Sequence, residues 1–185
     1  ENLGKSEFTI TITDDGKGMS EEGIIDAMNL GVINSTTARE ENDLGRFGLG
    51  LKTSSLSQCR KFSVLSKSQN TDMAGWTWDL DLLNKTNKWE MINVNDDDYL
   101  GARKLINENS SGTIIVWENI DNELIKATKD ETITDIWIRG INHIRMTFGK
   151  FMTDRGNINI WLNGDKIQPW DPFASDISEV VITED

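Results

Sequence analysis

Two glycine-rich runs near the N-terminus constrain the fold of this chain more than any other feature. The first, Asp14–Met19, follows an alternating segment at 7–13, and the second, Gly45–Lys52, leads into a segment of helical composition. Alternation of apolar and polar residues predicts a strand with one buried face. Glycine permits a sharp turn and a close approach of the backbone to a ligand. We therefore expect a strand, a tight loop, a helix, a polar loop and a second helix, in that order.

The chemistry of the two runs suits a nucleotide. Adenine carries an exocyclic amine that donates hydrogen bonds, and the carboxylate of Asp14, at the end of a strand expected to be buried, accepts but cannot donate. Gly16 and Gly18 let the backbone approach a flat base, and Met19 is a soft side chain suited to lie against a purine. A glycine-rich turn that opens a helix offers N–H groups to phosphates. A plain Asp-Gly turn and a flexible loop are the alternative interpretations.

A third element at Ser111–Val116 completes a pattern that resembles the GHKL ATPases, the superfamily of DNA gyrase B, the heat-shock chaperone of ninety kilodaltons, histidine kinases and MutL. Asp14–Met19 resembles their adenine-binding motif, and Gly45–Lys52 resembles the second glycine box that ends a mobile lid over the phosphates. Thr113 matches the threonine that lies near the base. The resemblance implies a nucleotide site made of Asp14, Gly16, Gly18, Met19, Asn29, Gly45, Phe47, Gly48, Gly50, Lys52 and Thr113.

Within that superfamily the chain is most similar to MORC-type ATPases and their bacterial relatives. The similarity rests on Gly112–Trp117 and on the run from Trp161 to Phe173. Asn29, followed by Leu-Gly, is similar to the chaperone's sequence before its lid. The resemblance implies ATP or ADP with Mg²⁺ as ligands, and a Bergerat-type ATP-binding fold.

The N-terminus departs from the family pattern. In these ATPases a helix before the first strand carries Glu-x-x-x-Asn, whose glutamate activates water and whose asparagine binds magnesium. Here only residues 1–6 precede the strand, and Glu1 and Asn2 are adjacent, so they cannot share a helical face at that spacing. We expect both residues to lie upstream of this chain, which would then be N-terminally truncated. No catalytic residue or metal ligand is assigned within it; the parent protein is expected to be an ATPase, and enzymatic activity of this chain is left open.

Composition limits the kinds of partner that the chain is expected to bind and the cellular compartment that it is expected to occupy. The net charge of −12 argues against nucleic-acid binding through this domain. A single cysteine, Cys59, excludes an internal disulfide and fits a reducing, cytoplasmic compartment, or the nucleus in a eukaryote. The sequence has no apolar run near the ~20 residues of a membrane span. The acidic run 95–98 is interpreted as a solvated loop because the glycine spacing of a calcium loop is missing.

The order of elements predicts an α/β two-layer sandwich, a mixed β-sheet with helices on one face. Ser20 is expected to cap the first helix, and Asn163-Gly164 to form a type I′ turn in a hairpin. Residues 1–173 are expected to form one ATP-binding domain with a lid at about 31–46, followed by an acidic tail or the start of another segment at 174–185. The predicted strands are 7–13, 61–66, 76–82, 89–93 and 113–118, and the predicted helices are 21–30, 48–58 and 130–152, the last packed on the sheet.

Functions of two classes fit these features. In the first, the chain is the ATP-binding domain of a MORC-like ATPase, in which nucleotide closes the lid and drives homodimerisation or a switch of protein partner. In the second, it is a nucleotide-sensing or protein-interaction module that does not hydrolyse ATP. A histidine-kinase catalytic domain fits less well, and His143 is interpreted as structural. Without the Glu-x-x-x-Asn helix that precedes the first strand in the family, an apolar sheet face is expected to stay uncovered, which predicts self-association.

Overall fold

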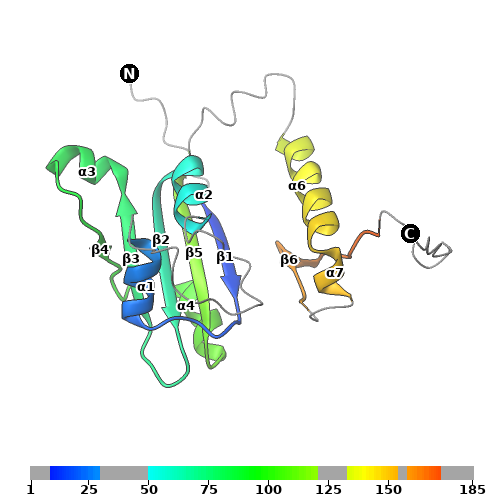
Figure 1. The fold of residues 1–185 in the computed structure, drawn as a ribbon, viewed down its shortest axis with the longest axis horizontal. Helices are drawn as coiled ribbons and strands as arrows, with labels where there is room; N and C mark the ends of the chain where they lie inside the picture. The colour runs from blue at the N-terminus through cyan, green and yellow to red at the C-terminus, as the bar shows by residue number, and fades with distance from the viewer. Residues whose placement is uncertain (1–8, 30–49, 121–132, 154–157, 172–185) are drawn as a thin grey trace, which may run out of the picture. The chain divides into compact units, whose positions relative to one another are not determined.

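The computed structural model describes residues 9–29, 50–120, 133–153 and 158–171 (Figure 1). The chain divides into two compact units, residues 1–124 and 125–185. This division falls inside the span 1–173 that we expected to be one ATP-binding domain, and that expectation stays a prediction. The expected lid at 31–46 and the tail at 174–185 lie outside the described residues.

A five-stranded sheet in the order β1-β5-β2-β3-β4 forms the centre of the first unit (Figure 1). Its two long strands pair with each other from Cys59 opposite Ile120 to Lys67 opposite Gly112. All described pairings are antiparallel, where a mixed sheet was expected. Strand direction could not be read from the sequence because side chains alternate with a period of two in either type of sheet. The strands are β1 Ile10–Asp14, β2 Cys59–Lys67, β3 Ala74–Asp79, β4 Ile92–Asn93 and β5 Gly112–Ile120.

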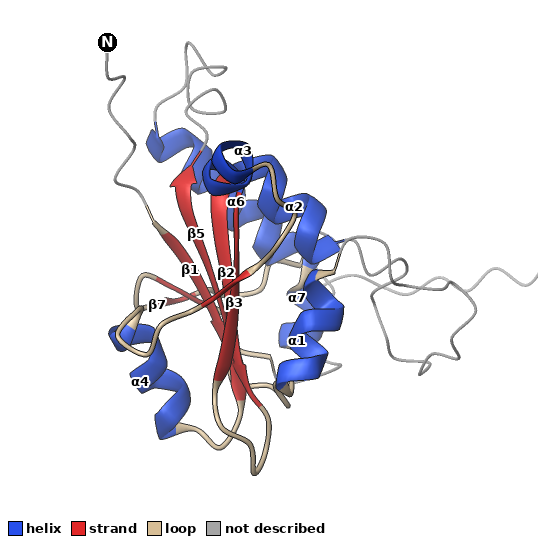
Figure 2. Ribbon diagram, turned by 90° about the vertical axis from the view of Figure 1, so that its left-hand side faces the viewer, coloured by secondary structure: helices blue, strands red, loops and turns tan. Residues whose placement is uncertain are grey.

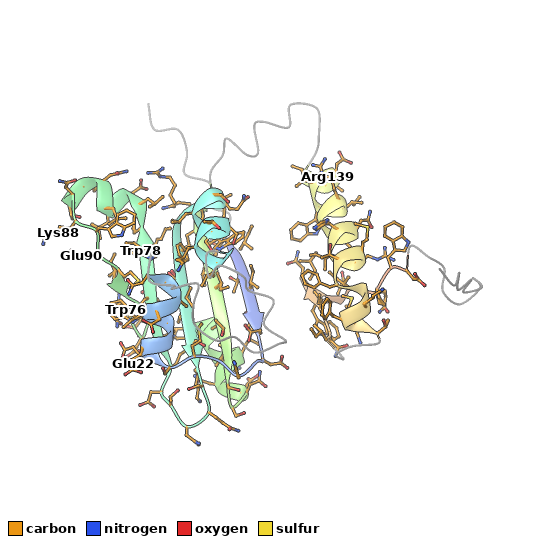
Figure 3. The ribbon with its side chains drawn as sticks, in the orientation of Figure 1. Glu22, Trp76, Trp78, Lys88, Glu90 and Arg139 are labelled. Atoms are coloured by element: carbon orange, nitrogen blue, oxygen red, sulfur yellow. The ribbon has the colours of Figure 1, made fainter. Side chains whose placement is uncertain are left out.

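Helices α1 (Glu21–Met28) and α2 (Gly50–Gln58) cover one face of this sheet, which we call the α1 face. Ile24 and Met28 of α1 are fully buried against a cluster that includes Phe62, Val64 and Trp78. Figure 3 shows Trp76 and Trp78 on β3, and the indole Nε1 of Trp78 donates to the carbonyl of Met28 at 3.1 Å. The α/β sandwich expected from the sequence is therefore confirmed.

The opposite face carries helix α4 (Leu100–Glu108), which lies across the sheet from α1 and α2 (Figure 2). Ile106 of α4 is buried with Leu65, Ile114 and Val116. The sequence predicted helices on one face of the sheet only, whereas the structure has a helix on the second face as well. Gly101 within α4 weakens the helical signal of that segment, which is why the sequence did not indicate it.

Side-chain caps set two boundaries. Ser20 caps α1 as expected, its Oγ accepting from the N–H of Gly23 at 3.2 Å. Strand β3 ends at Asp79, earlier than expected, because the Asp79 carboxylate accepts from the N–H groups of Asp81 and Leu82 and starts helix α3, Leu80–Thr86.

Strand β1 is exposed along its whole length, which corrects the expectation of a buried face. Ile10 and Ile12 remain 40% and 46% exposed. Both lie opposite β5 residues of the α1 face, Trp117 and Ile115. The physical reason is that, among the described residues, the helices of this face pack mainly on other strands: α1 on β2 and β3, and α2 on β2 and β5. Self-association through such a face stays a prediction.

The second unit contains helices α6 (Ile133–Thr147) and α7 (Gly149–Met152) and a hairpin of β6 (Trp161–Leu162) and β7 (Asp165–Lys166). The helix expected at 130–152 is therefore present but interrupted after Thr147. Asn163 and Gly164 have φ values of 51° and 91°, as a type I′ turn requires. Packing of this helix on the sheet stays a prediction. Among the described helices, none has the length and apolarity to cross a membrane.

Candidate nucleotide-binding site

The ends of β1 and β2 and the start of β5 meet at one end of the sheet and bring the first and third motifs together. Asp14, the last residue of β1, lies directly opposite Thr113 at the start of β5. Ser66, near the end of β2, lies opposite Thr113 on its other side. Residues directly opposite each other in an antiparallel sheet project to the same face. Asp14, Thr113 and Ser66 therefore form a row of polar side chains on the α1 face.

Asp14 is held in position by its own loop. Its Oδ1 accepts a hydrogen bond from the N–H of Gly16 at 2.9 Å, a local turn of the kind that Asp favours. The carboxylate has two oxygens, and Oδ2 has no partner among the described residues. Since the side chain is exposed, that oxygen can accept a hydrogen bond from a ligand.

One glycine in this loop and one at the start of β5 are required by backbone contacts. Gly18 has φ 64°, and a Cβ on it would lie 1.9 Å from the carbonyl oxygen of Lys67. Gly112 has φ 151°, and a Cβ there would lie 2.3 Å from the carbonyl oxygen of Asp14. A side chain at Gly16 would approach Asp14 Oδ1 to 2.8 Å. The loop after β1 therefore passes directly over the end of β2 and the start of β5, and only glycine fits at Gly18 and Gly112, where the close atoms belong to the backbone. At Gly16 the close atom is the end of the Asp14 side chain, which can move.

Ser66 connects the loop to the start of β5 and was not anticipated. Its side chain is fully buried. Its Oγ accepts from the N–H of Met19 at 2.9 Å, donates to the carbonyl of Gly112 at 2.9 Å and lies 3.0 Å from Thr113 Oγ1. A small hydroxyl side chain at the end of an apolar strand was the available signal.

Lys52 and Asn29, both expected at the site, contact each other. Asn29 ends helix α1, and its carbonyl accepts from Lys52 Nζ at 2.7 Å. Lys52 is 1% exposed, and this burial lowers the pKa of its ammonium group. An ammonium group has three protons to donate, and among the described residues only this one acceptor is present. A phosphate within reach would favour the charged form.

The glycine box is described only in part. Gly45, Phe47 and Gly48 lie outside the described residues. Gly50 is the first described residue of α2, and a Cβ on it would meet open space. The first N–H groups of a helix have no partner within the helix, and the binding of phosphate by the start of α2 stays a prediction. Within the described residues, no cluster of acidic, histidine or cysteine side chains is placed to hold a metal ion.

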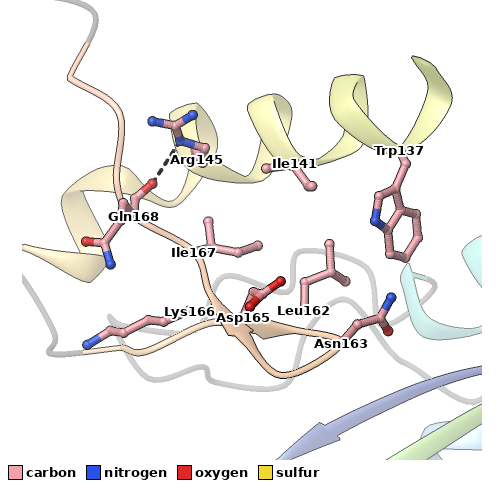
Figure 4. Close-up of a pocket in the computed structure, with 9 residues that line it drawn as sticks. All are labelled: Trp137, Ile141, Arg145, Leu162, Asn163, Asp165, Lys166, Ile167 and Gln168. Carbon is pink, nitrogen blue, oxygen red and sulfur yellow. Dashed lines mark hydrogen bonds between the residues drawn. The ribbon is translucent and has the colours of Figure 1, made fainter. Parts of the chain in front are cut away.

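A hollow of about 380 Å³ lies in the second unit, between α6 and the hairpin (Figure 4). Arg145 stands at one end, where its Nε donates to the carbonyl of Gln168 at 3.0 Å. None of the residues expected to bind nucleotide lines it. Its apolar lining consists of Trp137, Ile141, Leu162 and Ile167.

Comparison with known proteins identifies one family over residues 2–113. The family model described as "Histidine kinase-, DNA gyrase B-, and HSP90-like ATPase" matches residues 2–113. The match begins before β1, covers both glycine-rich runs and ends at Thr113. No curated protein sequence matches the chain.

Proposed function

The chain belongs to the histidine kinase-, DNA gyrase B- and HSP90-like ATPase family, and from this premise we propose that it binds the base of ATP at the end of the sheet where β1 and β2 end and β5 begins. Membership of this family implies nucleotide binding. The observation that supports this position most directly is Asp14. Its Oδ1 is held by Gly16, while the other oxygen is exposed beside Thr113.

The residues around Asp14 fit an adenine nucleotide. The free oxygen of Asp14 would accept from the exocyclic amine, and Gly18 would bring backbone close to the ring. The phosphates would meet the N–H groups at the start of α2, together with the remaining ammonium protons of Lys52. A bound Mg²⁺ would supply charge neutralisation at the phosphates; we assign none of the described residues as its ligand.

More specifically, we propose that the chain is a MORC-like ATPase domain in which nucleotide closes a lid at about 31–46 and drives dimerisation or a partner switch. Its support is the hydrogen bond between Lys52 and Asn29, because these residues flank the segment that holds the proposed lid. Phosphate bound to the remaining protons of Lys52 would be connected through this hydrogen bond to the end of α1.

A second candidate is an interaction module that binds nucleotide without hydrolysis. The exposed Ile10 and Ile12 favour it, because apolar side chains on an edge strand offer a surface to a partner. Phosphate release separates the two candidates when it is measured on protein that includes the sequence upstream of Glu1, where the water-activating glutamate is expected. Turnover that is lost on substitution of Asp14 supports the ATPase, and binding without turnover supports the module.

Calorimetric titration with ADP and with a non-hydrolysable ATP analogue, each with and without Mg²⁺, tests the proposed base site. Asp14→Asn replaces a charged acceptor and is expected to weaken binding by about 1.5–3 kcal/mol, the range for hydrogen bonds to charged groups. Asp15→Asn removes the same charge one residue away and should bind as the wild type does. Equal affinities for the wild type and Asp14→Asn would refute the site.

A further inference from the structure

We infer that Ser66 is a positioning residue that sets Thr113 as a hydrogen-bond acceptor and thereby makes the site select 6-aminopurines over 6-oxopurines. This inference rests on the proposed base site. It arises from the protons available to the two buried hydroxyls, Ser66 and Thr113, whose oxygens lie 3.0 Å apart.

The partners of Ser66 determine the direction of its hydrogen bonds. A serine hydroxyl has one proton to donate and two lone pairs to accept. The proton goes to the carbonyl of Gly112 at 2.9 Å, and one lone pair accepts from the N–H of Met19 at 2.9 Å. The second lone pair then accepts the proton of Thr113. The opposite assignment would leave the Gly112 contact without a proton, in a fully buried position where unmade hydrogen bonds are costly.

This assignment leaves Thr113 without a proton for a ligand. Its oxygen can still accept, as can the free oxygen of Asp14, which lies directly across the strand pair. Two neighbouring acceptors match a base edge that carries an amine. A 6-oxopurine places a carbonyl oxygen there instead, and an acceptor facing two acceptors makes no hydrogen bond. Loss of Ser66 would free the Thr113 hydroxyl to rotate and donate to such a carbonyl.

Ser63 provides a matched control. It lies on the same strand, is equally buried and also bonds to hydroxyls, Thr77 at 2.7 Å and Tyr99 at 3.0 Å. Its side chain projects to the α4 face, away from the row that contains Asp14. Ser63→Ala therefore removes a comparable buried hydroxyl without changing the base site.

The test compares ADP with inosine diphosphate, which differs at the 6-position and at N1, by calorimetric titration. We expect Ser66→Ala to weaken ADP binding about tenfold, since buried partners lose a hydrogen bond, and to lower the ratio of ADP to inosine diphosphate affinity by a similar factor. Ser63→Ala should leave the ratio unchanged. In a Thr113→Val background, Ser66→Ala should no longer change the ratio. A ratio unaffected by Ser66→Ala, or lowered equally in the Thr113→Val background, would overturn the inference.

Two further measurements keep the test decisive. If Ser66→Ala does not fold, Ser66→Cys keeps the side-chain volume with weaker hydrogen bonds and should lower the ratio in the same direction; an unchanged ratio counts against the inference. Amide exchange of Met19 without nucleotide should be faster in Ser66→Ala than in the wild type, and unchanged exchange would contradict the bond to Ser66.

A wild type that binds neither nucleotide refutes the proposed function, whereas one that binds ADP with a ratio independent of Ser66 refutes this inference alone.

Discussion

Replacement of Gly18 by alanine would test the close passage of the loop after β1 over the end of β2. Two costs add in this variant. The φ of 64° places an alanine in the left-handed region, which costs about 1–2 kcal/mol. The new Cβ would also lie 1.9 Å from the Lys67 carbonyl oxygen, whereas real Cβ atoms keep at least 3.0 Å. The loop must therefore move by roughly the difference of 1.1 Å, that is 3.0 minus 1.9.

Such a movement would lengthen the hydrogen bond from Met19 N–H to Ser66 Oγ from 2.9 Å to beyond bonding distance. Loss of this bond at a buried oxygen adds about 1 kcal/mol. We therefore expect Gly18→Ala to lower the free energy of unfolding by about 2–3 kcal/mol, measured by urea denaturation. Gly101→Ala is the control, because a Cβ there meets open space in α4 and alanine favours a helix by up to about 1 kcal/mol. A loss below about 1 kcal/mol for Gly18→Ala would refute the close approach of the loop to β2.

Two other substitutions test buried polar contacts. Burial lowers the pKa of Lys52, so the unfolded chain holds this proton more tightly than the folded chain does. The stability of the wild type should therefore rise relative to that of Lys52→Met as the pH increases from the lowered pKa towards 10.5. A difference in unfolding free energy that is the same at neutral and alkaline pH would contradict this. Tyr99→Phe removes a hydroxyl bonded to Ser63 and Glu118 and should lower the free energy of unfolding by about 1–2 kcal/mol. Its control, Ser57→Ala, removes an exposed hydroxyl and should change stability by less than about 0.5 kcal/mol.

Local features were predictable because each depends on residues close together in the chain. The cap at Ser20, the turn at Asn163 and Gly164, and the strands around Phe62 and Ile115 all agree with their sequence signals. The motif at Asp14 was also readable, since its aspartate and glycines form one short loop. The family match over residues 2–113 confirms the superfamily inferred from these motifs.

The sequence by itself thus determined the motif, the caps and turns, and the α/β class. The tertiary structure decided the antiparallel sheet, the exposure of β1, helix α4 on the second face, and the partners of Lys52 and Ser66. Ser66 meets Met19 and Thr113 at sequence separations of 47 residues each. No periodicity or turn preference encodes such a contact, because it arises only where three strand ends converge. The residues of the proposed base site are therefore recognisable one motif at a time in the sequence, but as a connected set only in the fold.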